Sequence, residues 1–436
     1  MATRRSAIGT HSPNTSPSGD SPVAVWKFGG TSVADHDRLR AVARRMVEAQ
    51  LGGRRVVAVL SAMGKSTDEL SGQAYQMSSR PPLRELDALL SVGESISCAL
   101  AAMAIHELGS RAVSFTGAQA GIRTDDKHGN ARLRQVRPER IAEALDDGAI
   151  VLVTGFQGVS DDGAVTTLGR GGSDASAVAV AAGLGVRECE IFTDVPAVFT
   201  ADPRVVPDAR RLTTLRHEEM LEMAEAGAGV LQPRSVELAA ARGVDIHLRS
   251  SFTTEDGTWI RKDPAAFETA FEGGENSTDV AGVAHRNHES LYSVRGVSAA
   301  VVGSALAARA VAIGAIVRHG EELRFTAPGA ADADVKAALG EVSADVSVHE
   351  DLGTVSVVSL GIARKPEIIP RALTALEEAG IEARFVTTTP GRVTAAVSAE
   401  LVHDAVRLLH EIFIPRRGCF DVTDLRSAAP RDTACA

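Results

Sequence analysis

The chain has 436 residues, of which 44% are hydrophobic and 23% are charged, a composition typical of a soluble globular protein. It is longer than a single hydrophobic core supports, so we expect two or three domains. The formal net charge of −10 argues against a general nucleic-acid binder, and no apolar run reaches the ~20 residues that would span a membrane.

The N-terminal residues 1–22 are rich in Ser, Thr, Pro and Gly and contain no apolar core. We expect a disordered tail there rather than a targeting peptide. The four cysteines are scattered and lack the C-x-x-C spacing of common metal and redox motifs. These features predict a cytoplasmic protein with reduced thiols.

Residues 23–60 show a strand–helix–strand rhythm. Residues 23–28 and 55–60 are apolar enough for buried strands, and residues 35–50 have the apolar periodicity of a helix. This rhythm predicts an α/β fold with a mainly parallel sheet covered by helices. Such sheets bind ligands where strands pass into loops, and three polar residues lie at or near junctions of this kind: Lys27, Ser61 and Thr67.

The alternation of helices and strands continues to residue 249. A helix is predicted over residues 83–108, and Glu94 near its middle is, taken alone, best explained as a solvated helix residue. Residues 116–133 are polar and are interpreted as a loop. Further strands are predicted at residues 112–115, 150–154, 189–192 and 244–249, and further helices at residues 217–226 and 235–241.

Residues 166–204 have the pattern of a phosphate-handling site. A glycine-rich turn at residues 168–174 leads into a helix of small residues, and the strand after that helix ends at Thr193 and Asp194. Glycines let backbone N–H groups approach an anion, and the N-terminus of a helix adds partial positive charge. This segment therefore predicts the functional centre of the chain.

The C-terminal part is predicted to form two smaller units after a linker at residues 263–280. Residues 281–345 and 346–425 each contain segments that fit a βαββαβ order, with the second clearer than the first. The offset of roughly 60 residues between them fits an internal duplication. Residues 426–436 are a short tail.

Five motifs resemble those of the aspartate kinases, members of the amino-acid kinase superfamily that carry paired regulatory ACT domains. They are KFGGTS at residues 27–32, SAMG at 61–64, GE at 93–94, TTLGRGGSD at 166–174, and TDV at 193–195 with TADPR at 200–204. The resemblance covers residues 23–413. It implies an amino-acid kinase domain at residues 23–262, a three-layer αβα sandwich, followed by two ferredoxin-like ACT units.

The activity implied by this resemblance is transfer of the γ-phosphoryl group of ATP to the β-carboxylate of L-aspartate, with Mg²⁺ as cofactor. Lys27 would stabilise charge on the transferring group, and Asp174 would orient Lys27 or the magnesium shell. Phe199 would lie beside the adenine, although a phenylalanine is by itself more often a core residue than a cofactor contact. The nucleotide-binding residues implied by the resemblance are Lys27, Gly29, Gly30, Thr31, Thr193, Asp194, Phe199 and Arg204.

The resemblance also implies how the amino acid is held. Arg170 would clamp the α-carboxylate, because its guanidinium presents two parallel donors to a carboxylate. Glu94 would bind the α-ammonium group. Ser173 and Thr67 would donate hydrogen bonds to the substrate carboxylates. Paired ACT domains further imply a homodimer.

The chain departs from the family pattern at several positions. Gly229 stands where a phosphate-contacting lysine is expected, and Ala197 replaces a glycine that would be strained as alanine if its φ were positive. Lys65 is best explained as a solvated loop residue, although it could replace the missing lysine. Neither C-terminal unit carries the Asp-x-Pro-Gly and asparagine signature of lysine- or threonine-binding ACT domains, which predicts weak feedback inhibition.

Two other functions remain open from the sequence. The departures at Gly229 and Ala197 favour a regulatory or amino-acid-binding subunit derived from a kinase. A kinase that phosphorylates an aspartate analogue would keep the same motifs. The residues Lys27, Glu94, Arg170, Ser173 and Asp174 favour an active aspartate kinase.

Overall fold

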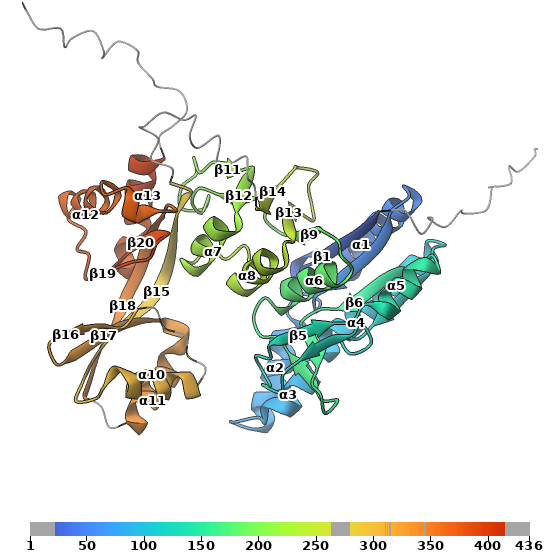
Figure 1. Cartoon of the computed structure of the whole chain (residues 1–436), viewed down its shortest axis with the longest axis horizontal. Coiled ribbons are helices and arrows are strands. Elements are labelled where there is room, and N and C mark those ends of the chain that lie inside the picture. Colours follow the sequence, from blue (N-terminus) through green and yellow to red (C-terminus); the bar gives the residue numbers. More distant parts are fainter. Residues whose placement is uncertain are drawn as a thin grey trace, which may run out of the picture. The chain divides into compact units, whose positions relative to one another are not determined.

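The computed structural model describes residues 22–262 and 280–414, except residues 310, 312, 314, 343 and 344. The predicted tails and nearly all of the predicted linker lie outside these described residues. Within them the chain forms two compact units (Figure 1). Unit 1 contains residues 22–199 and 210–262, and unit 2 contains residues 200–209 and 280–414.

Unit 1 is built on an eight-stranded sheet in the order β12-β14-β13-β9-β1-β2-β6-β3. The five pairings from β13 to β3 are all parallel, and β14 is antiparallel to β13. The mainly parallel sheet expected from the sequence is therefore confirmed. Its strands are β1 (Val23–Phe28), β2 (Arg55–Leu60), β3 (Ala112–Phe115), β6 (Ile150–Thr154), β9 (Glu188–Thr193), β12 (Thr214–Arg216), β13 (Asp245–Ser250) and β14 (Thr258–Arg261).

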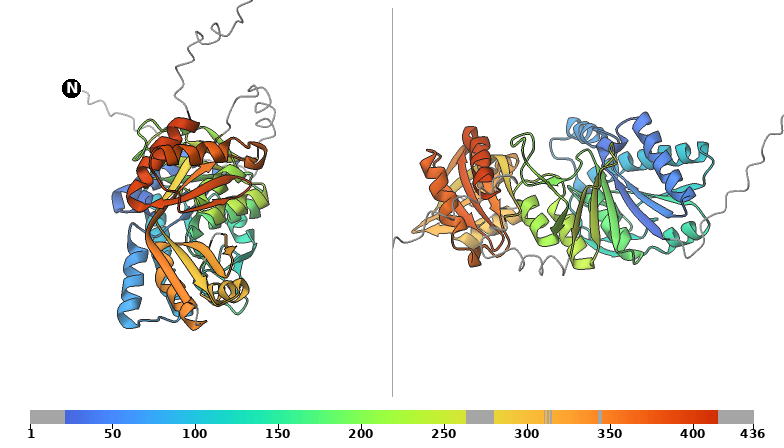
Figure 2. Two further views of the ribbon diagram at one scale, coloured as in Figure 1. Left: turned by 90° about the vertical axis from the view of Figure 1, so that its left-hand side faces the viewer. Right: turned by 90° about the horizontal axis from the view of Figure 1, so that it is seen from above.

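Helices cover both faces of this sheet (Figure 2). Side chains alternate between the two faces along a strand, so Trp26 and Phe28 pack in the core beside α1 and α4, while Lys27 between them faces α6. The face of the sheet that carries Lys27 is therefore opposite the face covered by α1 and α4. The helices of unit 1 are α1 (His36–Leu51), α2 (Ser66–Met77), α3 (Leu83–Leu90), α4 (Val92–Glu107), α5 (Glu139–Asp146), α6 (Gly172–Gly183), α7 (His217–Glu225) and α8 (Pro233–Arg242).

A second, four-stranded sheet in unit 1 was not expected from the sequence. Its order is β5-β4-β7-β8, formed by Leu133–Val136, Ile122–Thr124, Gln157–Val159 and Val165–Thr167. The prediction of a loop at residues 116–133 is therefore wrong, because strands of three or four residues are too short to show periodicity. Strand β8 leads directly into the glycine-rich turn. A two-stranded ribbon of β10 (Val198–Phe199) and β11 (Arg211–Leu212) completes the strands of unit 1.

The long helix predicted over residues 83–108 is observed as α3 and α4, joined at Ser91. This segment, Leu83–Glu107, is long and apolar enough to cross a membrane by length and composition. In unit 1, however, α4 packs against α1 and β3, and it contributes Cys98, Ala101 and Ile105 to the core. The segment thus has the packing of a core helix.

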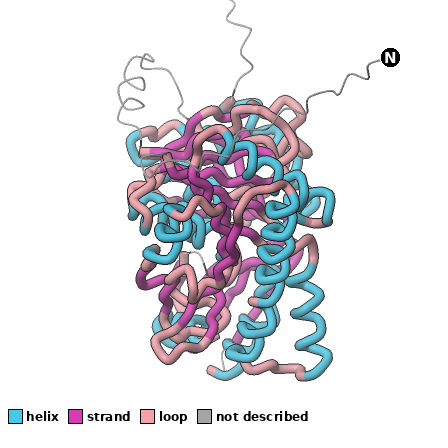
Figure 3. Tube along the Cα trace, turned by 90° about the vertical axis from the view of Figure 1, so that its right-hand side faces the viewer, coloured by secondary structure: helices cyan, strands magenta, loops and turns pink. Residues whose placement is uncertain are grey.

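Unit 2 contains a six-stranded sheet in the order β16-β17-β15-β18-β20-β19, and all its pairings are antiparallel. This antiparallel sheet with its helices agrees with the ferredoxin-like fold expected for the C-terminal part. Figure 3 colours the helices of the chain cyan and its strands magenta. The strands are β15 (Gly282–Arg295), β16 (Val317–His319), β17 (Glu322–Pro328), β18 (Asp345–Val358), β19 (Phe385–Thr388) and β20 (Arg392–Ser398). The helices are α10 (Ala299–Ala308), α11 (Asp332–Glu341), α12 (Ile368–Glu378) and α13 (Val402–Phe413).

The two long central strands of unit 2 are shared by both predicted C-terminal units. Strands β15 and β18 have 14 residues each and pair along their length, so Gly282 at the start of β15 lies opposite Val358 at the end of β18. Residues 282–286 therefore complete the sheet of the second βαββ segment. The two units are interlocked rather than consecutive, which differs from the predicted boundary at residues 345–346.

Residues 200–209 form part of unit 2, although the predicted kinase domain at residues 23–262 includes them. The side chains of Ala201, Val205 and Val206 are buried in a hydrophobic core with residues of α12 and α13. The backbone N–H of Val283 donates to the carbonyl of Thr200 at 2.7 Å. The chain leaves unit 1 after β10 and returns through β11, which pairs with β10.

Candidate active site

Lys27 and Asp174 form a buried ion pair at the carboxyl end of the sheet. Lys27 is the fifth residue of β1, and Asp174 lies in the first turn of α6. The Lys27 Nζ atom is 2.6 Å from Asp174 Oδ1, and the two side chains are only 11% and 10% exposed. An ammonium has three donors, so this pair fixes the lysine and still leaves donors for a bound anion.

The turn after β1 brings its backbone close to the loop that follows β2. A Cβ atom on Gly30 would lie 3.0 Å from the carbonyl of Ala62, and one on Gly29 would lie 3.4 Å from Lys27 Nζ. Glycine at position 30 therefore eases this close approach, whereas a Cβ at position 29 would make an ordinary contact. The resemblance places Gly29 among the residues that bind the nucleotide, but its N–H donates to the carbonyl of Phe192 at 3.1 Å and is not open to a phosphate in this structure.

Glu94 is a buried carboxylate in the first turn of α4, only 3% exposed. Its Oε1 atom accepts a hydrogen bond from the backbone N–H of Ala62 at 3.2 Å, and its Oε2 atom has no hydrogen-bond partner among the described residues. Burial raises the pKa of Glu94 to about 7. The interpretation of Glu94 as a solvated helix residue is wrong, and its open oxygen suits a cationic ligand.

The glycine-rich turn places Ser173 and Arg170 near this edge. Ser173 is 9% exposed and lies over the end of β6, since a Cβ on Gly155 would meet its Oγ atom at 2.7 Å. Gly171 has a φ of +69°, and a Cβ there would lie 2.3 Å from the side chain of Gln232. The exposed guanidinium of Arg170 has no hydrogen bond or ion pair within the described residues. Thr67 is half-buried in the first turn of α2.

The residues predicted to hold the nucleotide lie on neighbouring segments of unit 1, with one exception. Strand β9 pairs with β1 so that Phe192 lies opposite Phe28, which brings Thr193 beside Gly29. The Thr193 hydroxyl donates to Asp194 Oδ1 at 3.1 Å. Thr31 is exposed in the 3₁₀ turn Gly30–Val33, and Phe199 is half-buried in β10.

Arg204 is the exception, because it belongs to unit 2. Its guanidinium forms an ion pair with Asp202 Oδ2 at 2.6 Å, and its side chain is 88% exposed. Its contact with phosphate stays a prediction.

Comparisons with known proteins identify the family of the chain. Residues 22–250 match the model of the amino acid kinase family. The aspartokinase of Geobacillus stearothermophilus is 41% identical over 402 residues, covering 90% of this chain and 97% of that protein. The aspartokinase of Mycolicibacterium smegmatis is 43% identical over 412 residues, with 90% and 96% covered.

The chain belongs to the aspartokinase family. The aspartokinase III of E. coli, solved in complex with aspartate and ADP, aligns with a TM-score of 0.75 over 89% of this chain and 99% of that chain, at 24% identity. This likeness concerns the fold. An aspartate kinase from Synechocystis is 33% identical, with a TM-score of 0.51 and coverage of 90% of this chain and 69% of that chain. The resemblance stated from the motifs is confirmed.

Two departures from the aspartokinase pattern can now be judged in the fold. Among the described residues, Phe156 has the one positive φ outside glycine, so Ala197 is not strained as the sequence suggested. Ala197 is fully buried. Gly229 is exposed, and a Cβ built on it meets no atom within 4 Å. The position therefore has room for a long side chain.

Sequence reasoning missed two residues that hold the glycine-rich turn of this aspartokinase-family site. Arg234, at the start of α8, donates to the carbonyls of Leu168 and Ala131 and to Asn130 Oδ1. Asp87 in α3 is 1% exposed, and its Oδ1 atom accepts a hydrogen bond from the N–H of Gly129, next to Asn130. The spacing of seven residues between Asp87 and Glu94 is visible in the sequence, but it does not show that Asp87 is buried.

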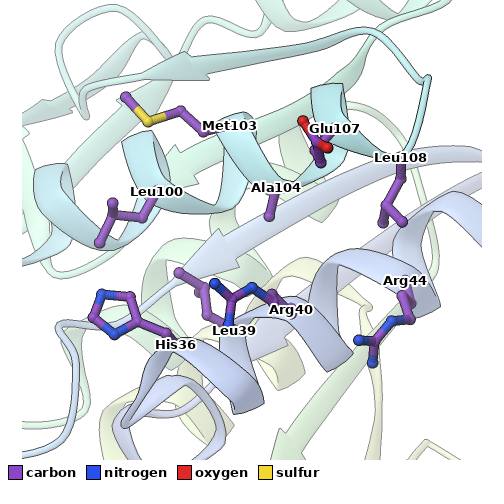
Figure 4. A pocket seen from close by; sticks show the side chains of 9 residues that line it. All are labelled: His36, Leu39, Arg40, Arg44, Leu100, Met103, Ala104, Glu107 and Leu108. Atoms are coloured by element: carbon purple, nitrogen blue, oxygen red, sulfur yellow. The ribbon is translucent and has the colours of Figure 1, made fainter.

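The hollow between α1 and α4 is not part of this site (Figure 4). It has a volume of about 320 Å³, and its walls include Leu39, Leu100 and Met103 together with Arg40 and Arg44. Since α1 and α4 cover the face of the sheet opposite Lys27, the hollow is separated from the Lys27–Asp174 pair by the sheet itself.

Proposed function

We propose that this chain transfers the γ-phosphoryl group of ATP to the β-carboxylate of L-aspartate, giving 4-phospho-L-aspartate. The observation that carries the proposal is the buried Lys27–Asp174 pair at the same sheet edge as Glu94, whose Oε2 is unpaired among the described residues. The aspartokinase relatives, at 41% and 43% identity over 90% of the chain, support the same activity.

The residues around Lys27 fit a nucleotide phosphate. Glycines at 29 and 30 place no side chain beside Lys27, and Lys27 supplies donors that Asp174 does not use. Bound magnesium would supply positive charge that offsets the negative charge of the phosphates. Asp174 would hold this ion together with phosphate oxygens, because its carboxylate lies beside Lys27 and carboxylate oxygens are ligands that magnesium prefers.

The transfer itself needs positioning and charge stabilisation rather than covalent help. Lys27, fixed by Asp174, stabilises negative charge as it develops on the transferring group. Ser173 and Thr67 orient the acceptor carboxylate by hydrogen bonds. Glu94 and Arg170 hold the α-ammonium and α-carboxylate, which distinguishes an α-amino acid from a simple dicarboxylate.

The test is to trap the acyl phosphate with hydroxylamine after incubation of the purified protein with MgATP and L-aspartate. Hydroxamate above the level of a Lys27→Ala control is expected. Bound aspartate without hydroxamate would contradict the proposal and favour a regulatory subunit or a kinase for an aspartate analogue.

The position of Gly229 provides a second prediction. Because its Cβ has open space and a lysine is expected there in the family, Gly229→Lys should add a charged donor for phosphate. We expect KM for ATP to fall or kcat to rise by roughly tenfold, the size of one charge-assisted hydrogen bond. Steady-state kinetics would show this, with Gly229→Met as the control for added bulk. Equal kinetics of both variants and the parent protein would contradict it.

We also propose that the protein acts in the cytoplasm as a homodimer through its ACT units. The support for association is β19, an outermost strand of the sheet of unit 2, which pairs on one side within the described residues and so offers an edge to a second copy. Cys98 and Cys189 are buried and form no disulfide, which fits a reducing compartment.

Feedback control is expected to be weak. Helix α10 starts at the cap Ser298, whose side chain accepts from the N–H of Val301, and no Asp-x-Pro-Gly turn precedes it. Glu382 lies near the position of the usual asparagine, and its Oε2 atom is 3.5 Å from Nε of Arg384. Isothermal titration should therefore show no tight binding of lysine or threonine, and micromolar binding of either would contradict this proposal.

A further inference from the structure

The most completely bonded buried carboxylate near the site is one that phosphoryl transfer does not use. Asp87 in α3 is 1% exposed. Its Oδ2 atom is 2.7 Å from Nδ1 of His128, and the N–H of Gly129 donates to both carboxylate oxygens at 3.0 and 3.1 Å. The hydroxyl of Thr167 donates to Oδ1. Burying a carboxylate is costly, so four such bonds indicate that its position is specified.

These partners form the base of the turn that carries Arg170. Thr167 ends β8, three residues before Arg170, and its carbonyl accepts from the N–H of Ala131 at 2.8 Å. Asn130 packs against the turn, since a Cβ on Gly169 would lie 2.9 Å from its Oδ1. Asp87 therefore holds the two chain segments on which the Arg170 turn rests.

The same helical segment carries Glu94. Asp87 and Glu94 are seven residues apart, which is about two helical turns, or roughly 10 Å along the axis, and places both on one side. Ser91 between them keeps helical dihedral angles, φ −61° and ψ −16°, and its carbonyl accepts from Nε2 of Gln157 at 2.9 Å. A rigid segment thus connects the residue that holds the Arg170 turn with the residue that faces the ammonium group.

We propose that Asp87 is a positioning residue that fixes the separation of Glu94 and Arg170 and so determines selectivity for an α-amino acid. This inference rests on the proposed function, because it takes Glu94 and Arg170 as the groups that hold the ammonium and carboxylate of aspartate. Asp87 contacts neither substrate. It acts through the helix and the turn.

The test compares Asp87→Asn with the parent protein by aspartate affinity and by kinetics. Asparagine keeps the shape but turns one acceptor into a donor that opposes the N–H of Gly129, which donates to both carboxylate oxygens. We expect Kd and KM for L-aspartate to rise about tenfold or more, with kcat and KM for ATP changed less than about threefold. Thr167→Val, which removes a single donor, should have a smaller effect in the same direction.

A double-mutant cycle with Arg170→Ala separates positioning from general destabilisation. If Asp87 acts through Arg170, Asp87→Asn should add little to the loss of aspartate affinity caused by Arg170→Ala. Additive losses, or equal losses for ATP and aspartate, would overturn the inference. Calorimetry measures Kd for aspartate without turnover. If the protein bound aspartate but made no hydroxamate, the kinase function would be refuted, and the Kd values would still test the role of Asp87.

Discussion

Lys27→Met should lower kcat for phosphoryl transfer by roughly a hundred- to a thousand-fold, the effect of removing one preorganised donor from developing transition-state charge. Methionine keeps most of the length of the side chain and removes its charge. The large effect is expected because Lys27 is held 2.6 Å from Asp174 in a site where both side chains are about 10% exposed. Coupled steady-state assays of ADP release would measure kcat.

The control must separate lost chemistry from lost folding, because Lys27→Met leaves Asp174 buried without its partner. Lys336→Met is a matched variant, since Lys336 also pairs with a carboxylate, Glu350, but is exposed in unit 2. It should leave kcat unchanged. Calorimetric binding of aspartate to the Lys27 variant would show that the site is still formed. A Lys27→Met protein that binds aspartate and keeps more than a tenth of kcat would contradict the assigned role.

Glu94→Gln should raise KM for aspartate by roughly ten- to a hundredfold, because a neutral amide cannot balance the buried ammonium group. The pH dependence is a sharper test. Burial raises the pKa of Glu94 to about 7, so its carboxylate is increasingly protonated below that pH in the free protein. We expect kcat/KM for aspartate to fall as the pH drops below about 7, and this acidic limb should be absent in Glu94→Gln.

The contribution of Glu94 to folding stability should fall as the pH rises, whereas kcat/KM for aspartate should rise. The pKa of Glu94 is raised on folding, so between its ordinary pKa and about pH 7 the folded protein binds more protons than the unfolded chain. The contribution of this carboxyl to stability is therefore present at low pH and is lost as the pH rises through 7. At pH 8, Glu94→Gln should therefore unfold at a higher temperature than the parent protein. Thermal unfolding at pH 5 and pH 8 measures this, and equal changes at both pH values would contradict the buried-charge explanation.

The long elements could be predicted from the sequence, but the short and shared ones could not. Strands β1, β2 and β6 are mostly apolar and almost wholly buried, and the sequence predicts their positions correctly. The strands of the second sheet have three or four residues and no resolvable period. The pairing of β15 with β18 depends on contacts between distant residues, which no local pattern reveals.

The candidate site shows the same division. The motifs identified Lys27, Glu94 and Asp174, and the structure brings Lys27 and Asp174 into contact. Sequence alone could not show that the N–H of Gly29 is already bonded to Phe192, because that bond crosses between strands β1 and β9. It also could not distinguish Asp87 from the other charged residues of α3, since its burial depends on the loop at residues 128–130.

The ten residues from Thr200 to Ala209 limit how this protein can be dissected. A fragment ending at residue 262 would carry this loop without the core that covers Ala201, Val205 and Val206, and the apolar side chains would face water. A fragment starting at residue 280 would lack the same residues from its interior. A single cut between the units therefore destabilises both fragments. To express the units separately, residues 200–209 must be replaced in the fragment that carries unit 1 and added to the fragment that carries unit 2.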